Sequence, residues 1–435
     1  MRLRAIRFFS VWVVVAAGVA GVAAAATFHC DPVRGAAGNP GTAAEPWGAL
    51  EEVIARGMIE LRDAGGGVAK PGAPVKGGDT ILLHGGWHGR IRLRAGYNDE
   101  FITIAAAPGQ LADVSQVVID GGRRWRVRGL RVSPSLAPRP PREPVRHLVQ
   151  LGEHGGDDST ELVVEDCFVF SVADASAWSA AEWTTAAASG IWLGRHGRGH
   201  VARNNYLRNT RMGIDLCAPG SLCEGNVVDG FSADGIRVTR DAIVVRHNVI
   251  KNNHVGAAAG DPNHDDGIQC FLFNRGRGLV RDVVIEGNII IERERRGLPL
   301  GNPLQGIGFF DGPLVNFTVR DNVVRVDHWH GVSLFDAQGC RVARNACWNP
   351  DPDSQRKPWV MLGGKQGLAR GNRVEDNLAH SFNLAADPGV SASGNRTVDA
   401  GQFEAAWKRA RDRIERAFGP EHPLARRPRV ADASP

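Results

Sequence analysis

Residues 248–270 read NVIKNNHVGAAAGDPNHDDGIQC, an Asn followed by a short apolar strand, a long polar loop and a Gly-Ile strand. The same order of features recurs on both sides with shorter loops. The Asn position is filled at Asn205, Asn226, Asn248, Asn288, Asn322, Asn345 and Asn377, with Asp166 as an early variant, and the Gly position at Gly190, Gly213, Gly235, Gly267 and Gly306, with Gly331 before Val332 as a late variant. Where no loop intervenes, the period is about 22 residues, as from Asn226 to Asn248.

A period of this size with three short β segments and no helix is typical of one coil of a solenoid. We therefore expect an all-β fold, a single-stranded right-handed parallel β-helix, with the handedness that parallel crossovers prefer. Asn tolerates the left-handed backbone of a tight corner, and stacked Asn side chains can pass amide hydrogen bonds along the axis. After Gly235, Ile236 and Val238 should face inward and Arg237 outward. Leucine-rich repeats have a similar period, but their Leu-rich consensus is absent.

The open ends of a β-helix need cover, because unpaired strand edges would pair with other chains. Apolar residues at helical spacing predict a helix over about 47–63, which should cap the first coil. A second amphipathic helix is expected within 399–418, from about Gln402 to Phe418, and could cover the last coil. These boundaries give one β-helix domain at 27–398 and a disordered tail at 419–435.

Residues 1–26 are expected to be a secretory signal, with a basic MRLRAIR segment, an apolar run and a small-residue cleavage site before Thr27. The alternative is an uncleaved membrane anchor, but the apolar run is shorter than the ~20 residues that a membrane span needs. We therefore expect a periplasmic or extracellular protein with no membrane contact after cleavage. We also expect it to be a monomer.

The charge of the chain gives no reason to expect a nucleic-acid partner. The formal net charge is +5, and removing Arg2, Arg4 and Arg7 with the leader leaves 5 − 3 = +2. The chain has seven cysteines, and export would permit disulfides. Cys217 with Cys223, and Cys340 with Cys347, could each close a small clip. The alternative is that the cysteines are small buried apolar residues, as expected for Cys167 and Cys270.

Equivalent positions of neighbouring coils should form rows along the solenoid, because parallel strands lie about 4.8 Å apart. The outward row after Gly-Ile contains Trp192, Asp215, Arg237, Gln269, Gly308 and Ser333, and the row before the Gly contains Ser189, Met212, Asp234, Asp266, Gln305 and His330. Asp234 and Asp266 should therefore lie on adjacent coils. His264 and Asp265 should join them from the edge of the inserted loop.

Three insertions, at 169–189, 251–266 and 292–305, should emerge along one edge of the same sheet and wall a groove. They carry Trp178, Trp183, His254, Arg293, Arg295 and Arg296. Trp faces can stack on sugar rings, and Arg guanidinium groups pair with carboxylates. Large insertions on one face of a repeat protein often mark its binding face.

This constellation suits three kinds of chemistry. Carboxylates one coil apart repel, which raises the pKa of one and supplies the acid and base of glycoside hydrolysis. Asp234, Asp265 and Asp266 could equally hold Ca²⁺, which takes carboxylate oxygens. In a lyase, Arg or Ca²⁺ would neutralise a uronate carboxylate while a base such as His264 removes the C5 proton. The candidate catalytic residues are Asp234, His264, Asp265, Asp266 and His330, and the candidate substrate-binding residues are Trp192, Asp215, Arg237, Gln269 and Arg293.

A family resemblance supports the fold. GNPGTAAEPWGALEEVI followed by GGDTILLHGGWHGRI resembles the N-terminal cap and first coil of bacterial right-handed parallel β-helix proteins of the pectin-lyase-like superfamily, and the Asn and Gly-Ile repeats are similar to its coils. The resemblance covers most of 27–395. Its members are mostly polysaccharide lyases, glycoside hydrolases and epimerases, with some non-catalytic members. The resemblance therefore implies a polysaccharide-active protein.

Two narrower resemblances concern the site. Ser-Ala-Asp234-Gly, Asp265-Asp266 and His330-Gly331 occur in the order of polygalacturonase-type hydrolase motifs. The sequence departs from that pattern, because Ser-Ala replaces Asn-Thr, His330 lies two coils beyond Asp266 instead of one, and the Arg-Ile-Lys element is absent. The DPNHD segment of 261–265 resembles the Asp-Pro-His motif of alginate epimerases, with an extra Asn inside it.

We expect a lyase acting on an acidic, uronic-acid-containing polysaccharide, with a polygalacturonase-like hydrolase as the alternative. A non-catalytic carbohydrate-binding or surface-adhesion module is the alternative of another class. Several candidates also have purely structural readings. Asp234-Gly235 is a common turn pair, Asp215 and Arg237 could be a surface ion pair, and the Arg residues near 293 could be a solvated loop. His264, Asp265 and Asp266, at the end of an inserted loop, are the hardest to explain as scaffold.

Overall fold

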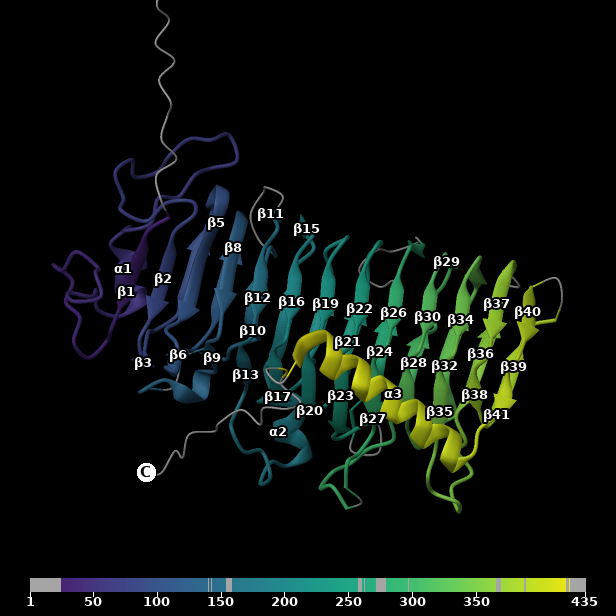
Figure 1. Ribbon diagram of the computed structural model, residues 1–435. Helices are drawn as coiled ribbons and strands as arrows, with labels where there is room; N and C mark the ends of the chain where they lie inside the picture. Colours follow the sequence, from purple (N-terminus) through teal and green to yellow (C-terminus); the bar gives the residue numbers. More distant parts are fainter. Residues whose placement is uncertain are drawn as a thin grey trace, which may run out of the picture.

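The computed structural model describes residues 25–139, 141, 143–153, 159–256, 260–261, 263–270, 279–295, 297–364, 369–386, 389–419 and 422. Its chain winds into one right-handed parallel β-helix with three long parallel sheets (Figure 1). The predicted leader and disordered tail lie almost entirely outside the described residues. Within those residues, no helix is long and apolar enough to cross a membrane.

Each coil contributes one strand to each long sheet, in the order A, B, C. Sheet A contains β1 (Thr27–Cys30), β2 (Thr80–Leu83), β5 (Tyr97–Ala106), β8 (Arg123–Arg128), β12 (Val163–Glu165), β16 (Val201–Arg203), β19 (Leu222–Glu224), β22 (Val244–Arg246), β26 (Val284–Glu286), β30 (Thr318–Arg320), β34 (Arg341–Ala343), β37 (Asn372–Glu375) and β40 (Val390–Ser393), with β11 (Ser159–Thr160) and β15 (Gly197–Arg198) beside this path.

Sheet B follows the Asn corner of each coil. It contains β3 (Gly86–Trp87), β6 (Ala112–Val114), β9 (Arg131–Val132), β13 (Phe168–Phe170), β17 (Tyr206–Thr210), β20 (Val227–Phe231), β23 (Val249–Asn253), β27 (Ile289–Ile291), β31 (Val323–Arg325), β35 (Ala346–Trp348), β38 (Leu378–Ala379) and β41 (Arg396–Thr397).

Sheet C begins at the Gly-Ile position. It contains β4 (Ile91–Arg94), β7 (Val117–Asp120), β10 (His147–Leu151), β14 (Ser189–Leu193), β18 (Ile214–Leu216), β21 (Ile236–Val238), β24 (Asp266–Cys270), β28 (Gln305–Phe309), β32 (His330–Phe335), β36 (Trp359–Gly363) and β39 (Ser381–Leu384). A small fourth sheet contains β25 (Val280–Arg281), β29 (Leu314–Val315) and β33 (Ala337–Gln338), and a 3₁₀ turn, η1, spans Pro134–Leu136.

The predicted asparagine ladder is present in the corner between sheets A and B. Asn288, for example, donates from Nδ2 to Oδ1 of Asn322 at 2.9 Å and to the carbonyl of Val245 at 3.0 Å. Its own Oδ1 accepts both the backbone N–H and the side-chain N–H of Asn248, each at 3.0 Å. The same pattern runs through Asn205, Asn226, Asn248, Asn288, Asn322, Asn345, Asn377 and Asn395.

The left-handed residue of this corner is not the Asn, which corrects the sequence prediction. It is the residue just before it, as at Asn204 (φ 53°), His247 (φ 57°) and Asp321 (φ 58°). Asp166 (φ 56°) also occupies this preceding position. Cys167 therefore takes the place of the Asn in that coil, and its backbone N–H donates to Oδ1 of Asn205 at 3.1 Å.

The interior is a stack of aliphatic side chains, and a column of Gly residues lets the chain turn into sheet C. Ile214, Ile236, Ile268 and Ile307 pair in register and are almost fully buried. At Gly235, a Cβ atom would lie 2.4 Å from Ile250 and 2.6 Å from the carbonyl oxygen of Gly267 on the next coil. A larger residue would therefore push neighbouring coils apart.

The N-terminal helix is much shorter than the predicted 47–63. Helix α1 spans Leu50–Ala55, where Leu50 and Val53 are buried in the core cluster. Beyond it, Ile59 and Val75 form a parallel bridge, so the apolar residues after the helix continue as extended chain. The six described cysteines are buried free thiols, so neither predicted disulfide clip forms, and the side chain of Cys270 lies outside the description.

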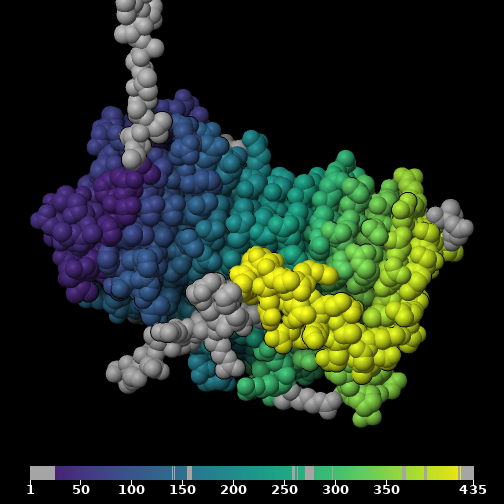
Figure 2. Space-filling model, in the orientation of Figure 1, coloured from purple at the N-terminus to yellow at the C-terminus, as the bar shows by residue number. Residues whose placement is uncertain are grey.

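The C-terminal helix is present, but it does not cover the last coil. Helix α3 (Ala400–Phe418) lies lengthwise across the outside of sheet B, as a ridge that Figures 1 and 2 show in yellow. Its buried residues Phe403, Ala406, Ala410 and Ile414 pack on an outward apolar row that includes Val227, Val249, Ile289, Val323, Ala346 and Leu378. The helix therefore bridges many coils.

We predict that Asn288→Ala lowers the free energy of unfolding by about 2–4 kcal/mol, because two buried donors of Asn248 and the carbonyl of Val245 lose their partner. Urea unfolding followed by circular dichroism measures this loss. The matched control is Asn395→Ala, which removes the half-exposed last Asn of the ladder. Equal losses for the two variants would contradict a cost that depends on burial.

Candidate functional site

The outward row of sheet C has the predicted register. Trp192, Asp215, Arg237, Gln269, Gly308 and Ser333 are successive partners in the parallel pairing. In the row before the Gly, Asp266 pairs with Gln305. The backbone N–H of Asp266 donates to Oδ1 of Asp234 at 3.1 Å, so these carboxylates lie on adjacent coils. The structure therefore gathers Asp234, Asp266, Arg237 and Gln269 on one face.

Arg237 is the buried cation of this cluster. Its Nε pairs with Oδ2 of Asp234, and a terminal nitrogen donates to Asn263 Oδ1 at 3.2 Å. Its Nε also lies 4.0 Å from Oδ1 of Asp215. Arg237 is 13% exposed and Asp215 is 5% exposed at the side chain, so the pair is not the surface ion pair considered as an alternative. Asp215 is therefore a buried partner of Arg237.

Asp265 is held by three side-chain amides. Oδ2 accepts from Asn253 at 3.0 Å and from Asn302 at 3.2 Å, and Oδ1 accepts from Asn263 at 3.1 Å. Burial raises the pKa of Asp265 to about 7 in spite of these donors. Because Asn253 and Asn302 come from two different insertions, Asp265 ties the two loops together.

His264 and Asp266 form a hydrogen-bonded pair with opposite exposure. His264 Nδ1 lies 3.2 Å from Asp266 Oδ2, and the His264 side chain is 65% exposed while that of Asp266 is fully buried. Gln269 Nε2 donates to the same oxygen at 3.0 Å. An Nδ1–H donated to Asp266 leaves the Nε2 lone pair of His264 for a ligand.

The pair shares its protons. Burial raises the pKa of Asp266, and the hydrogen bond from His264 offsets part of that rise. The hydrogen bond to Asp266 in turn raises the pKa of His264 above its usual 6.5. The two upward shifts thus have different causes, and the hydrogen bond between the groups makes them titrate as a unit. The other oxygen of Asp266, Oδ1, is buried without a hydrogen-bond partner among the described residues.

His330 lies two coils beyond Asp266 and does not touch the carboxylates. Its Nδ1 lies 2.8 Å from Ser333 Oγ and 3.3 Å from Trp359 Nε1. Because indole nitrogen only donates, Nδ1 is the acceptor and Nε2 carries the proton. Burial lowers the pKa of His330 to about 4, so the ring is neutral at neutral pH. Phe310 stands between it and His264, with ring centroids 4.9 and 6.3 Å away.

The carboxylates do not fit a Ca²⁺ ion. Oxygens of Asp234 and Asp265 face N–H donors, and a guanidinium lies against Asp234. A hard cation would have to displace those donors. Within the described part of the chain, no three His, Cys, Asp or Glu side chains are arranged to hold a metal ion.

Other predicted binding residues have different surroundings. Trp192 is half-buried, stacks on His147 with centroids 4.8 Å apart and donates to Glu153 at 2.9 Å. Arg293 is not part of the carboxylate cluster, because it pairs with Glu292. The other oxygen of Glu292 accepts from the backbone of Leu304 and Asp327, so this pair braces the loop.

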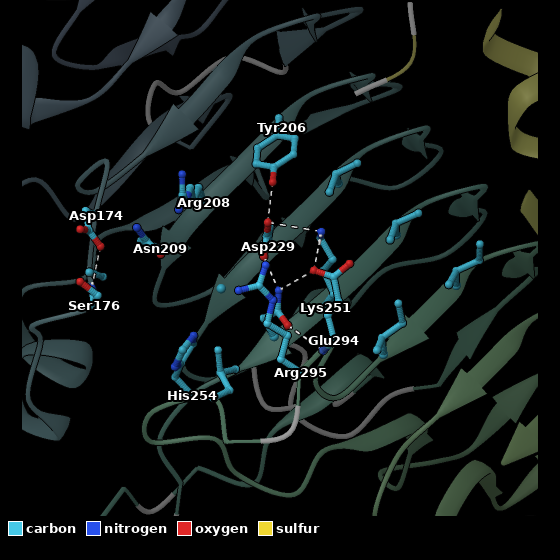
Figure 3. A pocket seen from close by; sticks show the side chains of 18 of the residues that line it. Asp174, Ser176, Tyr206, Arg208, Asn209, Asp229, Lys251, His254, Glu294 and Arg295 are labelled. Carbon is cyan, nitrogen blue, oxygen red and sulfur yellow. Dashed lines mark hydrogen bonds and ion pairs between the residues drawn. The ribbon is translucent and has the colours of Figure 1, made fainter. Parts of the chain in front are cut away.

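The loop residues expected to wall the sheet C groove lie elsewhere. Trp178, His254 and Arg295 line a cleft over sheet B, on the other side of the insertions (Figure 3). Helix α2 (Ala180–Thr185) carries Trp183, which is buried and stacked on His254 at 4.3 Å between centroids. Trp183 therefore packs the loops and offers no open ring face. Arg296 lies outside the described residues.

Sequence reasoning missed the aromatic patch beside His264 and the amides that hold Asp265. Phe310 follows Gly308 by two residues, so strand alternation could have placed it on the outer face. Trp359 pairs with His330 across β32 and β36, at the row position. Asn253, at the end of strand β23, and Asn302, in the third insertion, have no comparable signal, because the paths of the inserted loops bring them to Asp265.

No protein-family model matches the chain, and no curated protein sequence matches it. Its backbone is similar to that of a GH136 lacto-N-biosidase from Eubacterium ramulus, at 12% identity and a TM-score of 0.52, over 86% of this chain and 68% of that chain. It is also similar to pectate lyase Pel9A, at 12% identity and a TM-score of 0.48 over 87% and 83%. A third similar structure is that of a mannuronic acid-specific polysaccharide family 6 lyase from human gut microbiota. It is 15% identical, with a TM-score of 0.49, over 91% of this chain and 96% of that chain. At these identities the likeness concerns the fold alone.

We predict that Asp215→Asn makes stability less dependent on pH. Burial raises the pKa of folded Asp215 from 3.8 to about 6. The unfolded chain therefore loses this proton first, and the free energy of unfolding falls by about 2 kcal/mol as the pH rises from about 4 to about 6. Asp215→Asn should remove that fall. The unfolding free energy of the variant, measured relative to that of the wild type, should therefore be higher at pH 7 than at pH 4. Denaturant unfolding at both pH values checks this, with exposed Asp311→Asn as the control. Parallel curves for wild type and Asp215→Asn would contradict it.

Proposed function

We propose that the protein is a polysaccharide-active enzyme, a lyase that cleaves an acidic, uronic-acid-containing polysaccharide by β-elimination. The observation that carries this proposal is the exposed imidazole of His264 held against the fully buried carboxyl of Asp266. Similarity to lyases and a glycosidase of the same fold is compatible with a polysaccharide substrate. The leader predicted at 1–26 would bring the enzyme to such substrates outside the cytoplasm, as a monomer.

In the proposed reaction, His264 is the base. With Nδ1–H donated to Asp266, Nε2 takes the proton from C5 of the uronate, and the electron pair forms the C4=C5 double bond. The C4–O bond breaks, and the leaving oxygen takes a proton from the imidazolium or from water. Asp266 orients the ring and stabilises its charged form.

The C5 proton becomes acidic only when the neighbouring carboxylate is neutralised. Nε2–H of His330 is a neutral donor on the same face, and Arg237 is the cation beside Asp234. These two groups lie three strands apart on sheet C, so we assign them to the carboxylates of two different uronate units of the polymer. Phe310, between the two histidines, supplies an apolar surface for a sugar ring.

A hydrolase is less well supported, because glycoside hydrolysis needs two carboxyl groups that flank the scissile bond. Asp234 and Asp266 are fully buried at the side chain, and Asp265 is only 2% exposed. The group that reaches solvent is the imidazole. A non-catalytic binding module would not need the unpartnered buried Oδ1 of Asp266, which costs stability.

We predict that His264→Gln abolishes product formation, at least 100-fold, without changing stability, because the side chain is mostly exposed. Ultraviolet absorbance of the unsaturated sugar and release of reducing ends are followed over a panel of acidic polysaccharides, with EDTA or with added Ca²⁺. His196→Gln, at an exposed histidine of another loop, is the control. Reducing ends without absorbance would indicate a hydrolase, and binding without either product would indicate a binding module.

We predict that kcat/KM rises with pH through the raised pKa of His264, with a midpoint above 6.5. The base is active only after the shared proton is lost. Asp266→Asn removes the charge that holds this proton, so the midpoint should move to lower pH and the plateau should fall about 10- to 100-fold. A lower plateau with an unchanged midpoint would mean that Asp266 does not act through His264.

A further inference from the structure

The cleft over sheet B has a volume of about 1150 Å³ and lies between helix α3 and the inserted loops. Strands β17, β20, β23 and β27 form its base (Figure 3). Its walls include Asp174, Ser176 and Trp178 of the first insertion, Glu294, Arg295 and Pro299 of the third, and Trp407 and Arg411 of α3. His264 and the carboxylate row lie on sheet C and do not line it. The cleft is therefore separate from the proposed reaction site.

The floor of the cleft is a polar row beside an apolar row that helix α3 covers. Val227, Val249 and Ile289 are successive partners next to the Asn corner and are at most 2% exposed, because α3 packs on them. Arg208, Asp229 and Lys251 are successive partners two residues further from this corner. The part of the floor that a ligand can reach is therefore the polar row, which repeats at the rung spacing of about 4.8 Å.

The polar row is held in place by its own hydrogen bonds. Asp229 accepts from Tyr206 Oη and from Asn252 Nδ2, and lies 3.5 Å from Lys251 Nζ. Lys251 Nζ also lies 2.9 Å from Glu294, which accepts from Asn252 at 3.2 Å. This network joins three neighbouring coils and a loop, so the cleft is preorganised for a ligand.

Two guanidinium groups of the cleft, those of Arg208 and Arg295, make no contact ion pair with the carboxylates of the described residues, whereas Lys251 and Arg411 have acidic partners. Arg208 extends the polar row, and Arg295 follows Glu294 at the loop (Figure 3). Asp174, at the edge of the cleft, attracts Arg208 without forming a contact ion pair. Guanidinium groups that make no contact ion pair can form bidentate hydrogen bonds to the carboxylates of a ligand.

The geometry points to a second glycan-binding site, which holds a carboxylated oligosaccharide along sheet B through Arg208 and Arg295. Sugar hydroxyls can bond to Asp229, Lys251 and Asn252, whereas an alkyl chain would dehydrate these groups without replacing their water. The half-buried rings of Trp178 and Trp407 stand at the two walls. This inference rests on the proposed function for the class of glycan, and the site would retain the polymer while the other face reacts.

The test uses the full chain carrying His264→Gln, so that no substrate is consumed, and isothermal titration at low salt. The probe is a galacturonate hexasaccharide. We expect the double variant Arg208→Gln, Arg295→Gln to bind one hexasaccharide fewer per chain, or to bind it with a dissociation constant at least tenfold higher. Arg373→Gln, at an exposed guanidinium on sheet A, should leave binding unchanged. Circular dichroism confirms that each variant is folded.

Three outcomes would overturn the inference. These are unchanged stoichiometry and affinity in the double variant, equal binding of a neutral glucose hexasaccharide, and displacement of the hexasaccharide by dodecanoate, which would indicate an acyl ligand. The result is independent of turnover. If the wild type cleaves no polysaccharide but the double variant still loses a bound hexasaccharide, the proposed reaction fails while the cleft assignment holds.

Discussion

The hydrogen-bonded column of asparagines is the constraint on which the rest of the structure depends. From Asn226 to Asn377, each buried Asn satisfies the backbone and side-chain donors of the Asn in the coil before it and donates to a carbonyl of that coil. A coil that slipped by one residue would leave these groups without partners and would turn its outward residues into the core. The column therefore fixes the register where sheets A and B meet. Beyond the insertions, the close packing of Gly235 on the carbonyl of Gly267 sets the register of sheet C, and with it the contact between Asp234 and Asp266 across adjacent coils.

Features that repeat every coil were accessible from the sequence. The Asn corner, the Gly column and the outward row from Trp192 to Ser333 all depend on local spacing, and the structure has each of them. The left-handed residue of the corner was still placed one position too late. Asn often adopts the left-handed conformation, and the sequence does not distinguish an Asn with that backbone from one that only stacks its side chain. Cys167, in an Asn position, had no signal at all.

Features set by distant contacts were not accessible. The apolar face of α3 was visible, but its partner was not, because Val227, Val249 and Ile289 resemble core residues until the outward direction is known. The helix over 47–63 was overestimated because extended chain after Ala55 also buries its apolar residues. In the site, the loop carrying His264 was identified, whereas Asn302 meets Asp265 only when two insertions close on each other.

Helix α3 also changes the kind of solenoid that this chain forms. In a simple solenoid each coil interacts only with its neighbours, so the ends can unravel coil by coil. Here one helix packs against sheet B from Val227 to Leu378, and it couples coils that do not otherwise touch. The surface to which α3 binds is formed only after those coils have stacked, so α3 can pack only on a completed stack. We therefore expect the coils from Val227 to Leu378 to unfold together as one cooperative unit, whereas the coils of a simple solenoid can unfold one after another.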